Sequence, residues 1–122
     1  MNKHNARKRP EEVLHRSVAQ WLNVALTDKA FWFHPPNGGS RSKAEAGAFK
    51  AMGVKAGVPD IIVIYGGVVH AIELKPKGRY LSKAQRDCHL DLVRSGARVL
   101  PIARSIDDVG AFLRAYMPLR VP

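Results

Sequence analysis

The spacing of hydrophobic positions near the start of the chain predicts an amphipathic helix. Over residues 10–25 an apolar side chain returns at every third or fourth position, so one face of the helix would pack against a core. The apolar positions are Leu14, Val18, Trp21, Leu22 and Ala25. Proline suits the first turn of a helix. We therefore expect the helix to begin at Pro10 and residues 1–9 to form a disordered basic arm.

Short apolar runs predict the strands. Ile61–Tyr65 is continuously apolar and rich in β-branched residues, as in a buried strand. The glycine pair 66–67 signals a hairpin that returns through residues 68–75. Residues 31–33 and Arg98–Ala103 are the other two predicted strands, and a proline in the latter indicates an edge or an irregular end.

Helix signals occupy the segments between these strands. Residues 42–52 predict a second, basic helix that is closed by Gly53. Ser82 opens a third helix that Gly96 ends, and Ser105 caps a fourth. The predicted order is α-β-α-β-β-α-β-α, which is an α/β domain built on a small mixed β-sheet with flanking helices.

Scattered aromatic and histidine residues have structural interpretations. Trp32 and Phe33 are expected in the core. His34, His70 and His89 show no ligand spacing and are expected to be structural rather than metal ligands.

Composition and charge narrow the function. The 122 residues include 20 Lys+Arg against 10 Asp+Glu, which gives a formal net charge of +10. A hydrophobic content of 46% is too high for a disordered basic tail. The excess of positive charge on a small folded domain therefore favours a polyanionic partner, and nucleic acid first.

The sequence also argues against several classes of protein. No apolar run is long enough to cross a bilayer, and no apolar segment follows the basic N-terminus as it would in a secretory signal. The single cysteine, Cys88, cannot form an intramolecular disulfide, and no Cys/His spacing resembles a zinc site. We expect a cytoplasmic protein with no membrane partner, in which Cys88 is a buried, inert thiol.

The informative residues are the few acids placed among apolar positions. If the hairpin is symmetric about residues 66–67, Glu73 lies opposite Asp60, and Lys75 shares a face with Glu73. Two carboxylates held close together repel unless a cation joins them, and hard oxygen ligands suit Mg²⁺ or Mn²⁺. With Lys75 orienting or deprotonating a water, or stabilising charge on the phosphate, such a set could hydrolyse a phosphodiester.

These residues have ordinary alternatives. Glu-x-Lys triplets are common in surface ion pairs, and Asp60 could be only a turn residue. Gln85 completes a capping box with Ser82, and a role near the lysine would be invisible from spacing.

The first helix offers a third carboxylate. On a helical wheel Glu11 points toward the interior edge and Glu12 toward solvent. A buried-edge carboxylate needs a partner, which a shared metal would supply. The alternative is an acid placed in the first turn to favour the helix dipole.

In order along the chain, these motifs resemble the VRR-NUC domain, a branch of the PD-(D/E)xK nuclease superfamily. They are Glu11 followed by Leu14 and Trp21, residues 36–39 (Pro-Asn-Gly-Gly), 57–60 (Gly-Val-Pro-Asp), 73–75 (Glu-Leu-Lys), and 78–82 leading to Gln85. The resemblance runs from Glu11 to Tyr116, and a single domain is expected over residues 10–118.

The resemblance implies a restriction-endonuclease-like core and a set of roles. The metal ligands that it implies are Glu11, Asp60, Glu73 and the backbone carbonyl of Leu74. Lys75 would be the catalytic lysine, and Gln85 falls on the family's glutamine near the active site. Glu12 stays open as an alternative to Glu11. The position four residues after Glu11 is often glutamine in the family but is His15 here, so the contact made by His15 is left open.

Stand-alone phage and bacterial members of this family are similar in size to this chain. They resemble structure-selective endonucleases of replication, repair and recombination, which act as homodimers on branched DNA such as four-way junctions. The resemblance therefore implies a homodimer, because symmetric cleavage of a junction needs two copies related by a two-fold axis.

Basic residues flank the acids on both sides. Between Arg41 and Arg86 there are nine Lys/Arg and three acids. The expected phosphate contacts are Arg41, Lys43, Lys50, Lys77, Arg79 and Lys83. The sequence thus predicts a metal-dependent DNA endonuclease. The alternative is a non-catalytic basic module that binds nucleic acid and keeps the same fold.

Overall fold

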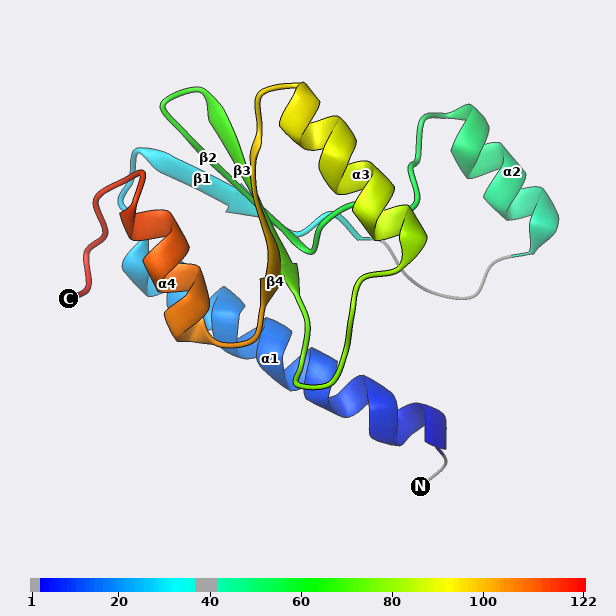
Figure 1. The fold of residues 1–122 in the computed structure, drawn as a ribbon, viewed down its shortest axis with the longest axis horizontal. Coiled ribbons are helices and arrows are strands. Elements are labelled where there is room, and N and C mark those ends of the chain that lie inside the picture. The colour runs from blue at the N-terminus through cyan, green and yellow to red at the C-terminus, as the bar shows by residue number, and fades with distance from the viewer. Residues whose placement is uncertain (1–2, 37–41) are drawn as a thin grey trace.

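The protein, in a computed structural model that describes residues 3–36 and 42–122, is a mixed β-sheet with helices packed on both faces (Figure 1). The elements in chain order are α1 (Lys3–Ala25), β1 (Ala30–Phe33), α2 (Lys43–Ala51), β2 (Ile61–Tyr65), β3 (Val68–Leu74), α3 (Lys83–Arg94), β4 (Arg98–Ala103) and α4 (Ile106–Arg114). This order confirms the predicted α/β fold.

The sheet, over the described residues, has the strand order β1-β2-β3-β4. The β1–β2 and β2–β3 pairs are antiparallel, whereas β4 runs parallel to β3. The sheet is therefore mixed, as predicted, and β4 with its proline lies at an edge. A parallel neighbour needs a crossover, and α3 provides it between β3 and β4.

The β2–β3 hairpin has the predicted register. Tyr65 pairs with Val68 and Ile61 pairs with Ile72. Both turn glycines have positive φ angles, 61° at Gly66 and 75° at Gly67. A two-residue turn of this kind requires positive φ at both positions, which only glycine adopts at little cost. Asp60 and Glu73 come one position beyond the last of these pairs, at the open end of the hairpin.

The hydrophobic core lies between one face of the sheet and helices α1 and α4. Ile61 and Ile72 of the hairpin are fully buried there, together with Leu22 of α1 and Leu113 of α4. Each such side chain contributes roughly 1.5–3 kcal/mol by leaving water. Figure 1 shows α3 across β4 from α4. The strands that carry the predicted acids are thus the best anchored part of the sheet.

Helix α1 begins earlier than predicted. It starts at Lys3 and contains Pro10 in its interior, so the expected start at Pro10 and the expected disorder of residues 3–9 are wrong. Proline removes one backbone donor and disfavours the helix interior, but the residues before Pro10 include good helix formers that carry the helix through it. None of the described helices is long and apolar enough to cross a membrane.

Strand β1 turns its aromatic residues to opposite faces. Trp32 pairs with Val63 and packs against the core, as predicted. Phe33 pairs with Ile62 on the other face and is 41% exposed, so its predicted place in the core is wrong. The cause is the two-residue period of a strand, which cannot bury consecutive side chains on one face.

Helix α2 stands away from the body of the molecule (Figure 1). Ser42 caps its start by accepting a hydrogen bond from the Glu45 N–H, and Gly53, with φ 99°, follows its end. No residue of this helix is buried. Its fold rests on local capping rather than on packing.

Candidate active site

The open end of the β2–β3 hairpin brings two carboxyl groups together. Asp60 lies just before β2, and its Oδ2 accepts a hydrogen bond of 2.8 Å from the backbone N–H of Leu74. This bond ties Asp60 to β3 beside Glu73, one step beyond the Ile61–Ile72 pair. The predicted juxtaposition of Asp60 and Glu73 is therefore confirmed.

An irregularity in the sheet occurs at Glu73. The β3–β4 register shifts between Ile72 and Leu74, and the Lys75 N–H then donates to the Ala103 carbonyl at 2.9 Å. Bulges of this kind re-aim side chains next to functional sites. Here the shift falls on the strand position that carries the second carboxyl.

Glu73 is buried almost completely, with 1% of its surface exposed. Burial, together with a hydrogen bond donated to the Asp60 carboxylate and the negative charge on that group, raises the pKa of Glu73 to about 9. The nearby Lys75 charge opposes this rise. Without a cation, the pair therefore holds a proton between its two carboxyl groups at neutral pH.

His89 of α3 contacts the carboxyl group of Glu73. Its Nε2 lies 3.0 Å from Glu73 Oε1, and its side chain is 8% exposed. Burial lowers the pKa of His89 and raises that of Glu73, so the contact is a hydrogen bond between neutral groups rather than an ion pair. The sequence did not predict this link between His89 and Glu73. The sequence signal for this contact is the position of His89, which lies on the inward face of α3 four residues after Gln85.

Lys75 follows directly after β3 and is half-buried. Its charge lowers the pKa of both Glu73 and His89, although burial is the larger cause for His89 and opposes Lys75 at Glu73. The ammonium group thus acts on the same cluster, as expected for the Glu-Leu-Lys motif.

Arg104, just after β4, holds the segment that follows Lys75. Its Nη1 donates to the carbonyls of Pro76 at 2.7 Å, Arg79 at 3.2 Å and Lys75 at 3.3 Å. The guanidinium also lies 5.5 Å from the centre of the Tyr80 ring. The contacts of Arg104 could not be predicted from the sequence, because they depend on β4 lying beside β3.

Two histidines border the Asp60 side of the site. The His34 Nδ1 lies 2.6 Å from the Asp60 carbonyl, so this nitrogen carries the proton that is donated. The rings of His34 and His15 are 4.3 Å apart, edge to face. Burial and His34 lower the pKa of His15, and Asp60 raises it. Helix α1 therefore presents His15 to the site.

Glu11 does not join the two carboxyls in a single cluster. It is exposed on α1, one turn before His15. Glu12 points to solvent, as predicted, in a 2.9 Å ion pair with Arg16. Within residues 3–36 and 42–122, no three His, Cys, Asp or Glu side chains gather closely enough to hold a metal ion. A ligand role for Glu11, or for the Leu74 carbonyl, stays a prediction.

Gln85 forms the predicted capping box. Its side-chain oxygen accepts from the Ser82 N–H at 2.9 Å, and its own N–H donates to Ser82 Oγ at 3.1 Å. The structural interpretation of this residue is confirmed, and a catalytic role stays a prediction.

The predicted phosphate contacts that the structure describes lie on α2, in the loop after β3 and on α3. Lys43 and Lys50 are exposed on α2, and Lys77 and Arg79 lie in the loop after β3. Lys83 is engaged in a 2.7 Å ion pair with Asp87 on the surface of α3. The remaining one, Arg41, lies outside the described residues.

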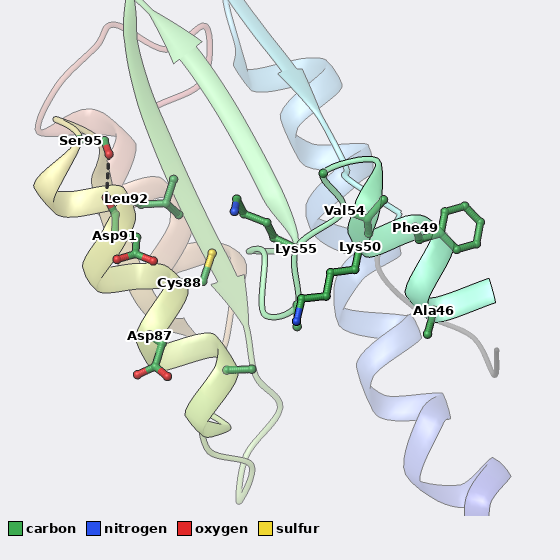
Figure 2. Close-up of a pocket in the computed structure, with 13 residues that line it drawn as sticks. Ala46, Phe49, Lys50, Val54, Lys55, Asp87, Cys88, Asp91, Leu92 and Ser95 are labelled. Atoms are coloured by element: carbon green, nitrogen blue, oxygen red, sulfur yellow. Dashed lines mark hydrogen bonds between the residues drawn. The ribbon is translucent and has the colours of Figure 1, made fainter. Parts of the chain in front are cut away.

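A groove lies between α2 and α3 (Figure 2). It encloses about 890 Å³, and Lys55 on the α2 side lies across from Asp91 on α3. Cys88 lines it and is half-buried rather than fully buried. Burial raises the pKa of its thiol, in keeping with the predicted inert cysteine. Neither Asp60 nor Glu73 lines this groove.

The donor chemistry of the hairpin end fits a hard divalent cation. Hydrogen bonds occupy Oδ2 of Asp60 and Oε1 of Glu73, which leaves the other oxygen of each carboxyl outside these two bonds. Mg²⁺ is commonly held by one or two carboxylates, with water and substrate phosphate completing its shell. A cation between the carboxyls would also replace the proton that they share.

Comparison with solved structures finds related domains. One, described as a VRR_NUC domain protein, has a TM-score of 0.68 and 26% sequence identity over 88% of this chain and 88% of its own. Another, described as a VRR_NUC domain, has a TM-score of 0.53 and 18% identity over 90% of this chain and 96% of its own, and it shows the fold alone. No family model and no curated protein matches the sequence. The structural likeness confirms the predicted VRR-NUC resemblance over 88% of the chain and supports a nuclease-type fold.

Proposed function

We propose that this VRR-NUC-type domain is a divalent-metal-dependent DNA endonuclease that hydrolyses phosphodiester bonds. The observation that carries the proposal is the pair of carboxyl groups, Asp60 and Glu73, held together at the hairpin end beside Lys75. A buried carboxyl next to a second one destabilises the metal-free fold. A protein that only binds a polyanion gains nothing from a carboxyl pair of this kind, in which Glu73 is buried.

The chain supplies the fixed parts of the site. The Leu74 N–H holds one oxygen of Asp60, and His89 holds one oxygen of Glu73. Each carboxyl would therefore offer its other oxygen to Mg²⁺ or Mn²⁺ as a single ligand. When bound, such a cation polarises the phosphate and lowers the pKa of a coordinated water.

Lys75 would act on the water or on the phosphate. It lies at the strand end next to Glu73, and the bonds of its backbone to Ala103 and Arg104 fix its position. From there an ammonium group can orient the attacking water and stabilise negative charge on the phosphate as that charge develops.

The basic surface would bring DNA to this site. Lys77 and Arg79 follow the catalytic strand directly, and Lys43 and Lys50 project on α2. Positive side chains of this kind bind phosphate without reading sequence. Selectivity would then come from DNA shape, and we propose a branched substrate, such as a four-way junction, cut by a homodimer.

A cleavage assay tests the proposal. Purified protein is incubated with labelled duplex, flap and four-way-junction DNA in Mg²⁺, in Mn²⁺ and in EDTA. We expect cutting with either metal and none in EDTA, with the junction cut fastest. Asp60→Asn, which keeps the size of the side chain, should abolish cutting.

The alternative function gives a different pattern. If the protein binds all three DNAs but cuts none with either metal, it is a non-catalytic binding module. A native mass measurement tests the homodimer, and a monomer that still cuts both strands of a junction would contradict that part of the proposal.

A further inference from the structure

The contact between α3 and the hairpin contains a buried atom without a partner. His89 is 6% exposed, and its Nε2 bonds to Glu73 Oε1. Among the buried side-chain nitrogens and oxygens of the described residues, only His89 Nδ1 lacks a hydrogen-bond partner. A buried polar atom of this kind calls for an explanation.

The missing partner indicates which nitrogen carries the proton. A neutral histidine has one donor and one acceptor nitrogen. Orphaned buried N–H donors are the rarer of the two defects, so Nδ1 is the acceptor and Nε2–H donates to Glu73. Oε1 of Glu73 is thereby occupied by a donor, which leaves Oε2 outside this bond.

Close backbone packing fixes the position of His89. A Cβ atom at Gly57 would lie 2.2 Å from the Ala84 carbonyl oxygen, so only glycine lets the first turn of α3 approach the loop that leads to Asp60. The Ser82–Gln85 capping box holds the same turn. His89 follows Gln85 by about one turn, and the same rigid helix therefore sets its distance from Glu73.

We infer that His89 is a positioning residue, which holds Glu73 so that a single oxygen is presented to a divalent cation beside Asp60. This inference rests on the proposed metal-dependent function. Groups that orient a metal ligand through a hydrogen bond commonly change metal affinity by 10–100-fold when they are removed. His89 belongs to this class, although it touches neither the cation nor the DNA.

The test compares two polar variants of different reach. The amide nitrogen of His89→Gln can take the place of Nε2, whereas that of His89→Asn is too short to reach Glu73. Titration calorimetry with MnCl₂ on the full chain measures the dissociation constant. We expect His89→Asn to weaken Mn²⁺ binding by about 10–100-fold and His89→Gln to stay close to wild type.

A second buried histidine supplies the matched control. His70 lies on β3, the strand that carries Glu73. It is fully buried, and its ring bonds to the Val63 carbonyl on the core face. His70→Gln should destabilise the fold but leave the Mn²⁺ constant unchanged. A purely structural role for His89 would instead lower the unfolding temperature of both 89 variants without separating their Mn²⁺ constants, and that result would overturn the inference.

The outcomes separate this inference from the proposed function. If wild type binds Mn²⁺ and cuts DNA, but His89→Asn binds Mn²⁺ equally well, the inference alone fails. If wild type neither binds Mn²⁺ nor cuts DNA, the proposed function fails. A further expected sign is that excess Mn²⁺ restores the cleavage rate of His89→Asn.

Discussion

The hairpin end and helix α2 are built in opposite ways. At the hairpin end, Asp60 and Glu73 are each held by a donor from another segment, and Glu73 has 1% of its surface exposed. Helix α2 has no buried residue and carries exposed lysines. A site that activates a water needs fixed atoms, whereas a surface that attracts phosphate needs only charge. The difference predicts that mutations at the hairpin end lower the cleavage rate without changing DNA affinity, and that mutations on α2 do the reverse.

Lys75 gives the largest expected effect in this comparison. Lys75→Ala removes the ammonium group beside Glu73 and should lower the cleavage rate by about 10²–10⁴-fold. DNA affinity, measured by fluorescence anisotropy in EDTA, should change little, because one phosphate contact among several would be lost. Equal loss of affinity and of rate would show that the two regions are not separate.

Glu73 tests whether the carboxyl pair is costly to the fold. In the absence of metal, folded Glu73 keeps its proton up to about pH 9, whereas the pKa of an unperturbed glutamate is 4.5. Between these two values the folded state binds the extra proton, so the free energy of unfolding falls as pH rises.

Glu73→Gln should remove this slope. The amide mimics the protonated acid, so the variant in EDTA should be more stable than wild type at pH 8, on the order of a few kcal/mol, and similar at pH 5. It should not cut DNA. Thermal unfolding at the two pH values is the measurement, and parallel pH profiles for wild type and Glu73→Gln would contradict the burial argument.

Variants of Arg104 test whether a fixed loop after β3 is needed for the cleavage rate. Arg104→Ala removes hydrogen bonds to three carbonyls and should lower kcat/KM by up to about 10²-fold through misplacement of Lys75. The lysine ammonium reaches less far than Nη1, so Arg104→Lys should recover only part of the rate.

A surface arginine provides the control for Arg104. Arg94 is exposed and only 3.7 Å from Asp91 in a surface pair. Arg94→Ala should leave kcat/KM near wild type. Equal effects of the two alanine variants would mean that net charge, rather than the position of the loop, sets the rate.

Helix α2 gives the smallest expected effect. The double variant Lys43→Ala/Lys50→Ala should weaken DNA binding about equally for all sequences and flatten the salt dependence by about one unit of slope per lost contact. The rate at saturating DNA should not change. Lys29→Ala removes one exposed charge before β1 and serves as the control for the single variants Lys43→Ala and Lys50→Ala.

The sequence predicted the parts of the fold that are set locally. The glycine pair at 66–67 determines the hairpin register, and the register determines which residues face one another. Asp60 and Glu73 could therefore be paired by counting. The predicted start of α1 was wrong because a helix can continue through Pro10. The predicted burial of Phe33 was wrong because Trp32 and Phe33 are consecutive in a strand and therefore face opposite sides of the sheet.

The parts set by packing between distant segments could not be predicted. The contact of His89 with Glu73 depends on how α3 docks against Gly57, and the reach of Arg104 depends on β4 lying beside β3. Helical and strand periods describe one element at a time. The two carboxyls were thus predicted from the sequence, and the groups that hold them were revealed by the structure.

Cleavage and binding of one four-way junction, measured together, test the central claim most directly. Wild type and Asp60→Asn are incubated with the junction in EDTA, and Mg²⁺ is then added in excess. We predict that both proteins bind the junction in EDTA, and that Mg²⁺ starts cutting by wild type alone. Cutting in EDTA, or equal cutting by Asp60→Asn after Mg²⁺ is added, would contradict the assignment of Asp60 and Glu73 as the metal-binding pair of a nuclease.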